Sequence, residues 1–170
     1  GRCAVVLPQG VLFRSGKEGD IRKQLVESDK LECIIALTSG VFYSTGVSAC
    51  ILFLNNNKKV EHRGRICLID ASNIYTSQRA QNIMTEDDIQ KVFGLYKAYE
   101  DVIEKAKVVT IEDIRQKDYT LAINSYIEKK GQATIPPAEV RRQYFEAYEE
   151  MLQAEEKMKK LLLDGGYVSE

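Results

Sequence analysis

Apolar residues in the first half of the chain come in short runs separated by polar and turn residues. Four runs, at residues 2–7, 31–37, 47–54 and 65–69, are rich in Val, Ile, Leu and Cys and have the length of buried strands. Between the first two runs, residues 17–27 carry apolar side chains at helical spacing among charged ones, which predicts an amphipathic helix. Strands interleaved with a helix in this way are typical of an α/β fold.

A polar segment, Asn55-Asn-Asn-Lys-Lys59, separates the third and fourth runs. A short polar turn between two apolar strands is typical of an antiparallel hairpin. We therefore predict that residues 51–53 pair with the fourth run at an edge of the sheet, since mixed sheets often carry an antiparallel edge.

The second half of the chain has a different pattern. Thr85 is followed by three acidic residues, which is a helix-capping signal, so residues 76–130 are predicted to form a helical extension that also holds a short extended segment. Glycine and a proline pair within residues 131–137 interrupt regular structure and indicate a linker. The predicted parts of the chain are therefore residues 1–75, 76–130 and 131–170.

The last of these parts is predicted to contain one long helix with an apolar stripe. Tyr144, Met151 and Met158 recur every seven residues, and Leu161 occupies a complementary position. Such a stripe either folds back on its own chain or contacts another subunit. Because the helix follows a linker, we favour a partner and take these four residues as partner-binding.

Composition limits the range of functions. The chain of 170 residues, 44% hydrophobic and 29% charged, can bury one ordinary core. Its apolar runs are far shorter than the roughly 20 residues that span a bilayer. A net charge of −1 shows no global basic surface for nucleic acid, so any DNA contact must be local or shared with partners.

The cysteines and the single histidine argue against a metal site. Cys3, Cys33, Cys50 and Cys67 each lie in or beside an apolar run, none in a CxxC spacing. We interpret them as buried free thiols, which favours a reducing, cytoplasmic compartment. His62 has no acidic or nucleophilic partner at a suggestive spacing, so a surface role is favoured over catalysis.

Three short motifs occur in a distinctive order: Leu7-Pro-Gln-Gly-Val-Leu-Phe13, Glu18-Gly-Asp-Ile-Arg-Lys23 and Phe42-Tyr-Ser-Thr-Gly-Val47, the last followed by an apolar strand. With these motifs the chain resembles the modification (methyltransferase) subunit of type I restriction-modification systems, an N6-adenine DNA methyltransferase. The resemblance implies an α/β fold: the C-terminal part of the Rossmann-like sheet of an S-adenosylmethionine-dependent methyltransferase, with appended α-helices. Its implied partners are DNA, the specificity subunit and the restriction subunit.

Two motifs of that family do not occur in the chain. The family binds S-adenosylmethionine at a glycine-rich loop and holds the target amino group at an Asn/Asp-Pro-Pro-aromatic motif, whereas the adjacent prolines here, Pro136 and Pro137, follow Ile135. We therefore expect this chain to contain no catalytic residue and to be inactive alone. We expect the methyl donor, S-adenosylmethionine, to be bound by a missing N-terminal part of the full-length parent protein. The alternative is a non-enzymatic interaction module whose C-terminal helix binds a partner.

The resemblance also implies residues of a DNA-binding cleft. Phe42 corresponds to the aromatic residue that stacks on the extruded adenine, with Tyr43 as a weaker neighbour, although an aromatic beside a buried strand is also typical of core packing. The strand exit at Pro8, Gln9 and Gly10 is implied to border the same cleft, and the alternative there is a plain turn. The list of cleft-lining candidates is completed by Thr45, whose alternative role is to satisfy the loop backbone.

Basic residues on the predicted first helix offer a further DNA contact. Arg14, Lys17, Arg22 and Lys23 form a small basic patch, but Glu18 and Asp20 alternate with them, which favours an ordinary solvated helix face.

Overall fold

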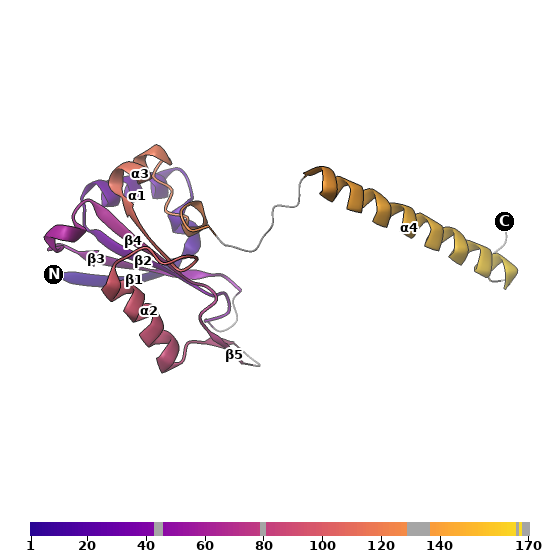
Figure 1. The fold of residues 1–170 in the computed structure, drawn as a ribbon, viewed down its shortest axis with the longest axis horizontal. Helices are drawn as coiled ribbons and strands as arrows, with labels where there is room; N and C mark the ends of the chain where they lie inside the picture. The colour runs from indigo at the N-terminus through magenta and orange to yellow at the C-terminus, as the bar shows by residue number, and fades with distance from the viewer. Residues whose placement is uncertain (43–45, 79–80, 129–136, 166, 168–170) are drawn as a thin grey trace. The chain divides into compact units, whose positions relative to one another are not determined.

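The computed structural model describes residues 1–42, 46–78, 81–128, 137–165 and 167. The chain forms two units, Gly1–Lys129 and Lys130–Glu170 (Figure 1). The first unit holds the sheet and the second holds one long helix, α4 (Pro137–Asp164). Within the described residues, no helix is long and apolar enough to cross a membrane.

The first unit is built on a five-stranded mixed sheet. Its strands are β1 (Arg2–Pro8), β2 (Leu31–Leu37), β3 (Ala49–Asn55), β4 (Arg65–Ala71) and β7 (Ala106–Thr110), in the spatial order β1-β3-β2-β4-β7. β3 runs antiparallel to both β1 and β2, whereas β4 runs parallel to β2. The strands β1, β2 and β4 therefore run in the same direction, and their C-terminal ends lie at the same end of the sheet.

The predicted hairpin between β3 and β4 is wrong. β3 pairs with β1 and β2, and β4 pairs with β2 and β7. The segment between β3 and β4 passes from one side of β2 to the other through a short 3₁₀ helix, Val60–His62. The physical reason is burial: β2 is buried at all seven positions, which a strand achieves only with neighbours on both edges.

Helices cover both faces of the sheet. α1 (Lys17–Glu27) and α3 (Ile111–Gln116) lie on one face and α2 (Glu86–Ala98) lies on the other (Figure 1). Each face has its own apolar core, one including Val26, Ile34 and Ile114 and the other including Ile35, Ile69 and Val92. The α/β fold class predicted from the sequence is confirmed.

The helices α2 and α3 each begin with a capping box. Thr85 accepts a hydrogen bond from the Asp88 amide, whose carboxylate accepts one back from the Thr85 amide, and Thr110 does the same with Asp113. The predicted cap at Thr85 is confirmed. Two short strands, β5 (Thr76–Ser77) and β6 (Asn82–Ile83), precede α2 and form a small separate sheet.

A group of polar side chains forms hydrogen bonds at the opposite end of the sheet, where β2 and β4 begin. The Tyr99 hydroxyl donates to the carbonyl oxygens of Glu32 and Arg65, at 3.2 and 3.1 Å. The buried Lys58 ammonium lies 2.7 Å from Asp29 Oδ1 and 2.8 Å from the Arg65 carbonyl oxygen. His62, expected at the surface, instead stacks on the Tyr99 ring at 3.6 Å between centroids, with its side chain 14% exposed.

Several details differ from the sequence-based expectations. Arg22 was expected on a solvated or DNA-facing helix surface, but it is buried and donates to the carbonyl oxygens of Val11, Arg14 and Tyr119. Its guanidinium thus joins α1 to two loops that would otherwise leave buried acceptors unsatisfied. Cys3 is exposed, whereas the other three cysteines are buried and free as expected.

One surface contact predicts how the stability of the fold depends on pH. Arg115 contacts both carboxylate oxygens of Glu27, at 2.8 and 2.7 Å, and the Tyr119 hydroxyl donates to Glu27 at 2.6 Å. These hydrogen bonds lower the pKa of Glu27 from 4.5 to about 2. Because the pKa is lower in the folded state, the stabilisation is present above pH 4.5 and is lost as the pH falls towards 2.

We therefore expect Glu27→Gln to lower the free energy of unfolding at neutral pH and to match the original chain near pH 2, as measured by urea denaturation across that range. Glu100→Gln, at an exposed position, serves as the matched control. An equal deficit for Glu27→Gln at both ends of the pH range would contradict the assignment.

Candidate functional site

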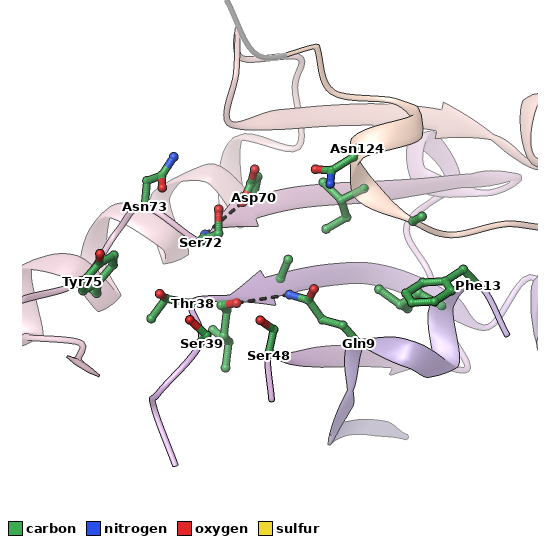
Figure 2. A pocket seen from close by; sticks show the side chains of 15 residues that line it. Gln9, Phe13, Thr38, Ser39, Ser48, Asp70, Ser72, Asn73, Tyr75 and Asn124 are labelled. Carbon is green, nitrogen blue, oxygen red and sulfur yellow. Dashed lines mark hydrogen bonds between the residues drawn. The ribbon is translucent and has the colours of Figure 1, made fainter. Parts of the chain in front are cut away.

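A cavity of about 420 Å³ opens at the end of the sheet where β1, β2 and β4 finish (Figure 2). We call it the strand-end cleft. Hydroxyl and amide side chains form much of its wall, together with apolar residues of the sheet and its neighbouring loops. These polar residues include Ser39, Ser48, Ser72, Asn73, Tyr75 and Asn124. The C-terminal ends of parallel strands are where open α/β sheets bind ligands, because loops from several strands converge there.

Gln9 is the predicted site residue that the structure brings into this cleft. Its amide nitrogen donates to the carbonyl oxygens of Leu37 and Ala49, both at 3.2 Å, and its backbone amide donates to Ser48 at 2.9 Å. The side chain therefore ties the exit of β1 to the end of β2 and the start of β3. Pro8 ends β1 and Gly10 lies in the 3₁₀ turn that follows, so both flank Gln9 in the chain.

Phe42 lies in the connection between β2 and β3, residues 38–48, which we call the Phe42 loop. The loop leaves β2 at the strand-end cleft, and Thr38, Ser39 and Ser48 from its two ends line the cavity. The Phe42 side chain is 46% exposed and is not among the residues that line the cavity. Tyr43 and Thr45 lie outside the described residues.

Sequence reasoning missed the part of the cleft that follows β4. Ser72, Asn73 and Tyr75 line the cavity there, and the Ser72 amide donates to Asp70 Oδ1 at 2.9 Å, which closes the turn. The Ser72 hydroxyl oxygen is buried without a hydrogen-bond partner, so it retains its bonding capacity inside the cavity wall. The available signal was the polar Asp70-Ala-Ser-Asn73 sequence directly after a buried strand.

The wall of the cleft carries few groups that could hold a metal ion or the methyl donor. The described residues contain no cluster of three or more His, Cys, Asp or Glu side chains placed to bind a metal. Gly40, the glycine at this edge, has a φ of +72°, but the position a Cβ would take is 3.5 Å from the Asn82 amide nitrogen. The Asn82 side chain thus packs against this turn, and none of the glycines that the structure describes lines the cleft, so its described wall lacks the glycine-rich loop that would fit S-adenosylmethionine.

The four residues predicted to bind a partner are all exposed on α4. Tyr144, Met151, Met158 and Leu161 are 63, 51, 55 and 63% exposed. Further exposed apolar side chains that the heptad reading missed widen the surface: Phe145, Tyr148 and Leu152. Their spacing relative to Tyr144 at one, four and eight residues was the signal in the sequence.

Comparison with known proteins identifies the family. Residues 1–134 match the family described as N-6 DNA methylase, and the chain belongs to that family. It is 40% identical, over 129 residues, to the type I restriction enzyme MjaVIII methylase subunit of Methanocaldococcus jannaschii, covering 74% of this chain and 22% of that protein. It is 31% identical to the MjaIX methylase subunit of the same organism over 169 residues, covering 94% of this chain and 30% of that protein.

A solved structure agrees. The chain resembles the type I restriction-modification methyltransferase subunit of Streptococcus thermophilus with a TM-score of 0.70 and 36% identity, over 75% of this chain and 27% of that one. The resemblance to type I modification subunits seen in the motifs is thus confirmed. The chain spans between about a fifth and a third of the length of these relatives, at 22–30%.

The bonds of the Gln9 amide predict a measurable contribution to stability. Gln9→Leu removes the donor to two carbonyl groups at the strand ends, so we expect it to lower the free energy of unfolding by about 1–2 kcal/mol in urea denaturation. The control is Gln24→Leu, the same change at an exposed position of α1, which should stay within about 0.5 kcal/mol. Equal small effects in both variants would show that the Gln9 amide is not a structural tie.

Proposed function

We propose that this chain is part of a type I modification subunit that methylates N6 of adenine in DNA, and that it supplies one wall of the cleft that receives the target base. The observation that carries the proposal is the meeting of the β1, β2 and β4 ends with the Phe42 loop at a single cavity, in a chain of the N-6 DNA methylase family. The methyl donor is S-adenosylmethionine.

The physical task of this wall is to receive a base that has left the duplex. An adenine can be methylated at N6 only after it is flipped out of the stack, which costs a few kcal/mol. Phe42, about half exposed, offers an aromatic face that replaces the lost stacking. Gln9, Ser39 and Ser48 supply hydrogen-bonding groups in the wall of the strand-end cleft. In the sequence, Tyr43 and Thr45 belong to the Phe42 loop, and Pro8 and Gly10 flank Gln9.

The opposite wall, which binds the donor and orients the amino group, is supplied by polypeptide outside this chain. Support comes from β1, whose one described partner is β3, so that its other edge is open for further strands. Val6 near the end of that strand is 51% exposed, although it lies within an apolar run. A strand with one open edge and uncovered apolar residues is suited to an interior position in a larger sheet.

We also infer that α4 binds the specificity subunit, and that the restriction subunit joins the same complex with DNA in the cytoplasm. The support is the exposed apolar stripe on α4 and a relative whose alignment covers 94% of this chain and so includes part of this helix. Large exposed apolar surfaces of this kind mark protein interfaces. The same observation favours the second candidate, an interaction module without catalysis, which differs in predicting no role for Phe42.

A substitution at Phe42 tests the base-binding role. Phe42→Ala in the complete subunit, assembled with its specificity subunit, is expected to weaken capture of the flipped base by about 1–3 kcal/mol, because one stacking face is lost. The rise in fluorescence of 2-aminopurine placed at the target adenine measures this step. Because Phe42 is 46% exposed, folding stability and donor affinity should hardly change.

The matched control is Phe93→Ala, which removes a similarly exposed phenylalanine from α2. It should leave the 2-aminopurine signal unchanged. If Phe42→Ala unfolds the protein, the side chain is a core residue. If it folds and captures the base normally, the assignment of this wall is wrong.

A charge on the α4 stripe tests the partner surface. Met151→Glu buries an unpaired charge if this face docks on the specificity subunit, so we expect the dissociation constant to rise at least about tenfold in titration calorimetry. Gln153→Glu adds the same charge on the opposite side of the helix and should leave affinity nearly unchanged. Equal affinities for both variants would contradict the proposal.

A further inference from the structure

The small β5–β6 hairpin lies against the Phe42 loop and has no role in the function proposed so far. Its two strands pair Thr76 with Ile83 and Ser77 with Asn82. From the second strand, the backbone amide of Asn82 donates to the carbonyl oxygen of Gly40 at 2.9 Å. The side-chain amide of the same residue donates to the carbonyl oxygen of Ser39 at 2.8 Å. One residue thus holds two successive peptide groups of the loop.

The geometry of the loop at this point makes these bonds consequential. Gly40 has a φ of +72°, a left-handed conformation that places its carbonyl oxygen within reach of the Asn82 backbone amide and that of Ser39 within reach of the Asn82 side chain. The Asn82 amide nitrogen lies 3.5 Å from the position that a Cβ on Gly40 would occupy. The turn and the asparagine are therefore fitted to each other, and Phe42 follows the turn by two residues.

The far end of the loop is fixed separately. The backbone amide of Gln9 donates to the carbonyl oxygen of Ser48 at 2.9 Å, just before β3 begins. Among the described loop residues, the start at Ser39 and Gly40 is held by Asn82 and the end at Ser48 is held by Gln9. In the sequence Phe42 lies between these two attachments, two residues after the one at Gly40.

We propose that Asn82 is a positioning residue that holds the Phe42 loop in the conformation that presents the aromatic ring to an extruded base. This inference rests on the proposed function, because it assigns Asn82 a role through Phe42 and not through contact with DNA. A loop that spends less time in its binding conformation captures the base with an apparent affinity reduced by the same factor. Losing one hydrogen bond of this kind shifts such an equilibrium about fivefold.

The first measurement concerns the loop alone and uses the 170-residue chain. Asn82→Ala removes the side-chain bond to Ser39 and keeps the backbone bond to Gly40. We expect the ¹⁵N order parameters of Gly40 and Val41 to fall from the rigid value of about 0.85 towards 0.6. Asn82→Asp, which replaces the donor with an acceptor facing a carbonyl, should act in the same direction. Ser77→Ala, at the exposed position opposite Asn82, should change neither value.

The second measurement uses the complete subunit with its specificity subunit and DNA that carries 2-aminopurine at the target position. Asn82→Ala and Asn82→Asp should raise the apparent dissociation constant for base capture, by at most about fivefold, while donor affinity stays the same. Ser77→Ala should behave like the unaltered protein. A general loss of folding would lower donor affinity as well, so the two effects are separable.

The results distinguish failure of the inference about Asn82 from failure of the proposed function. Unchanged order parameters in both Asn82 variants overturn the inference, because the loop would not depend on this residue. A looser loop with normal base capture also overturns it, provided that Phe42→Ala still impairs capture, and the proposed function then stands. Normal capture in Phe42→Ala marks the failure of the proposed function itself.

Discussion

The complete burial of β2 is the constraint on which the rest of the structure depends. A strand that is buried at every position needs neighbours on both edges and cover on both faces. Here β3 and β4 supply the edges, in opposite directions, and the two apolar cores supply the faces. Because β4 and β1 run parallel to β2, the loops that follow these three strands lie together at one end of the sheet.

The two ends of that sheet have opposite characters. Where β2 and β4 begin, the Tyr99 hydroxyl and the Lys58 ammonium donate to carbonyl groups, Lys58 pairs with Asp29, and His62 stacks on Tyr99 with its Nδ1 atom buried without a hydrogen-bond partner. Where they end, the strand-end cleft is lined by hydroxyl and amide groups, and the Ser72 oxygen is buried without a partner. Buried hydrogen bonds stabilise the first end, while the polar side chains that line the cleft at the other end are suited to ligand contacts.

The sequence predicted β1, β2, β3 and β4, the helix α1, the cap at Thr85 and the family resemblance, because each of these depends on local spacing, but it did not predict β5, β6 or β7. It did not predict that β4 lies beside β2, since the Asn/Lys segment after β3 looks like a hairpin turn and only the burial of β2 excludes that pairing. Arg22 was misread for a related reason: a charged residue on a helix is usually solvated, and its carbonyl acceptors, on Val11, Arg14 and Tyr119, are brought to it only by the folding of the segments on either side of α1. Gln9 was singled out for its amide, but its bonds to Leu37 and Ala49 exist only once three strands are assembled.

The role that we propose for Phe42 places two opposing demands on this exposed aromatic residue. Its face must stay free, which forbids the packing that normally fixes a phenylalanine ring. Its position must nevertheless be defined, because binding is weakened in proportion to the time the loop spends elsewhere. Fixing the backbone and not the ring resolves the conflict. The bonds of Asn82 and Gln9 to loop carbonyl groups do this on either side of Phe42, and they leave the aromatic face available.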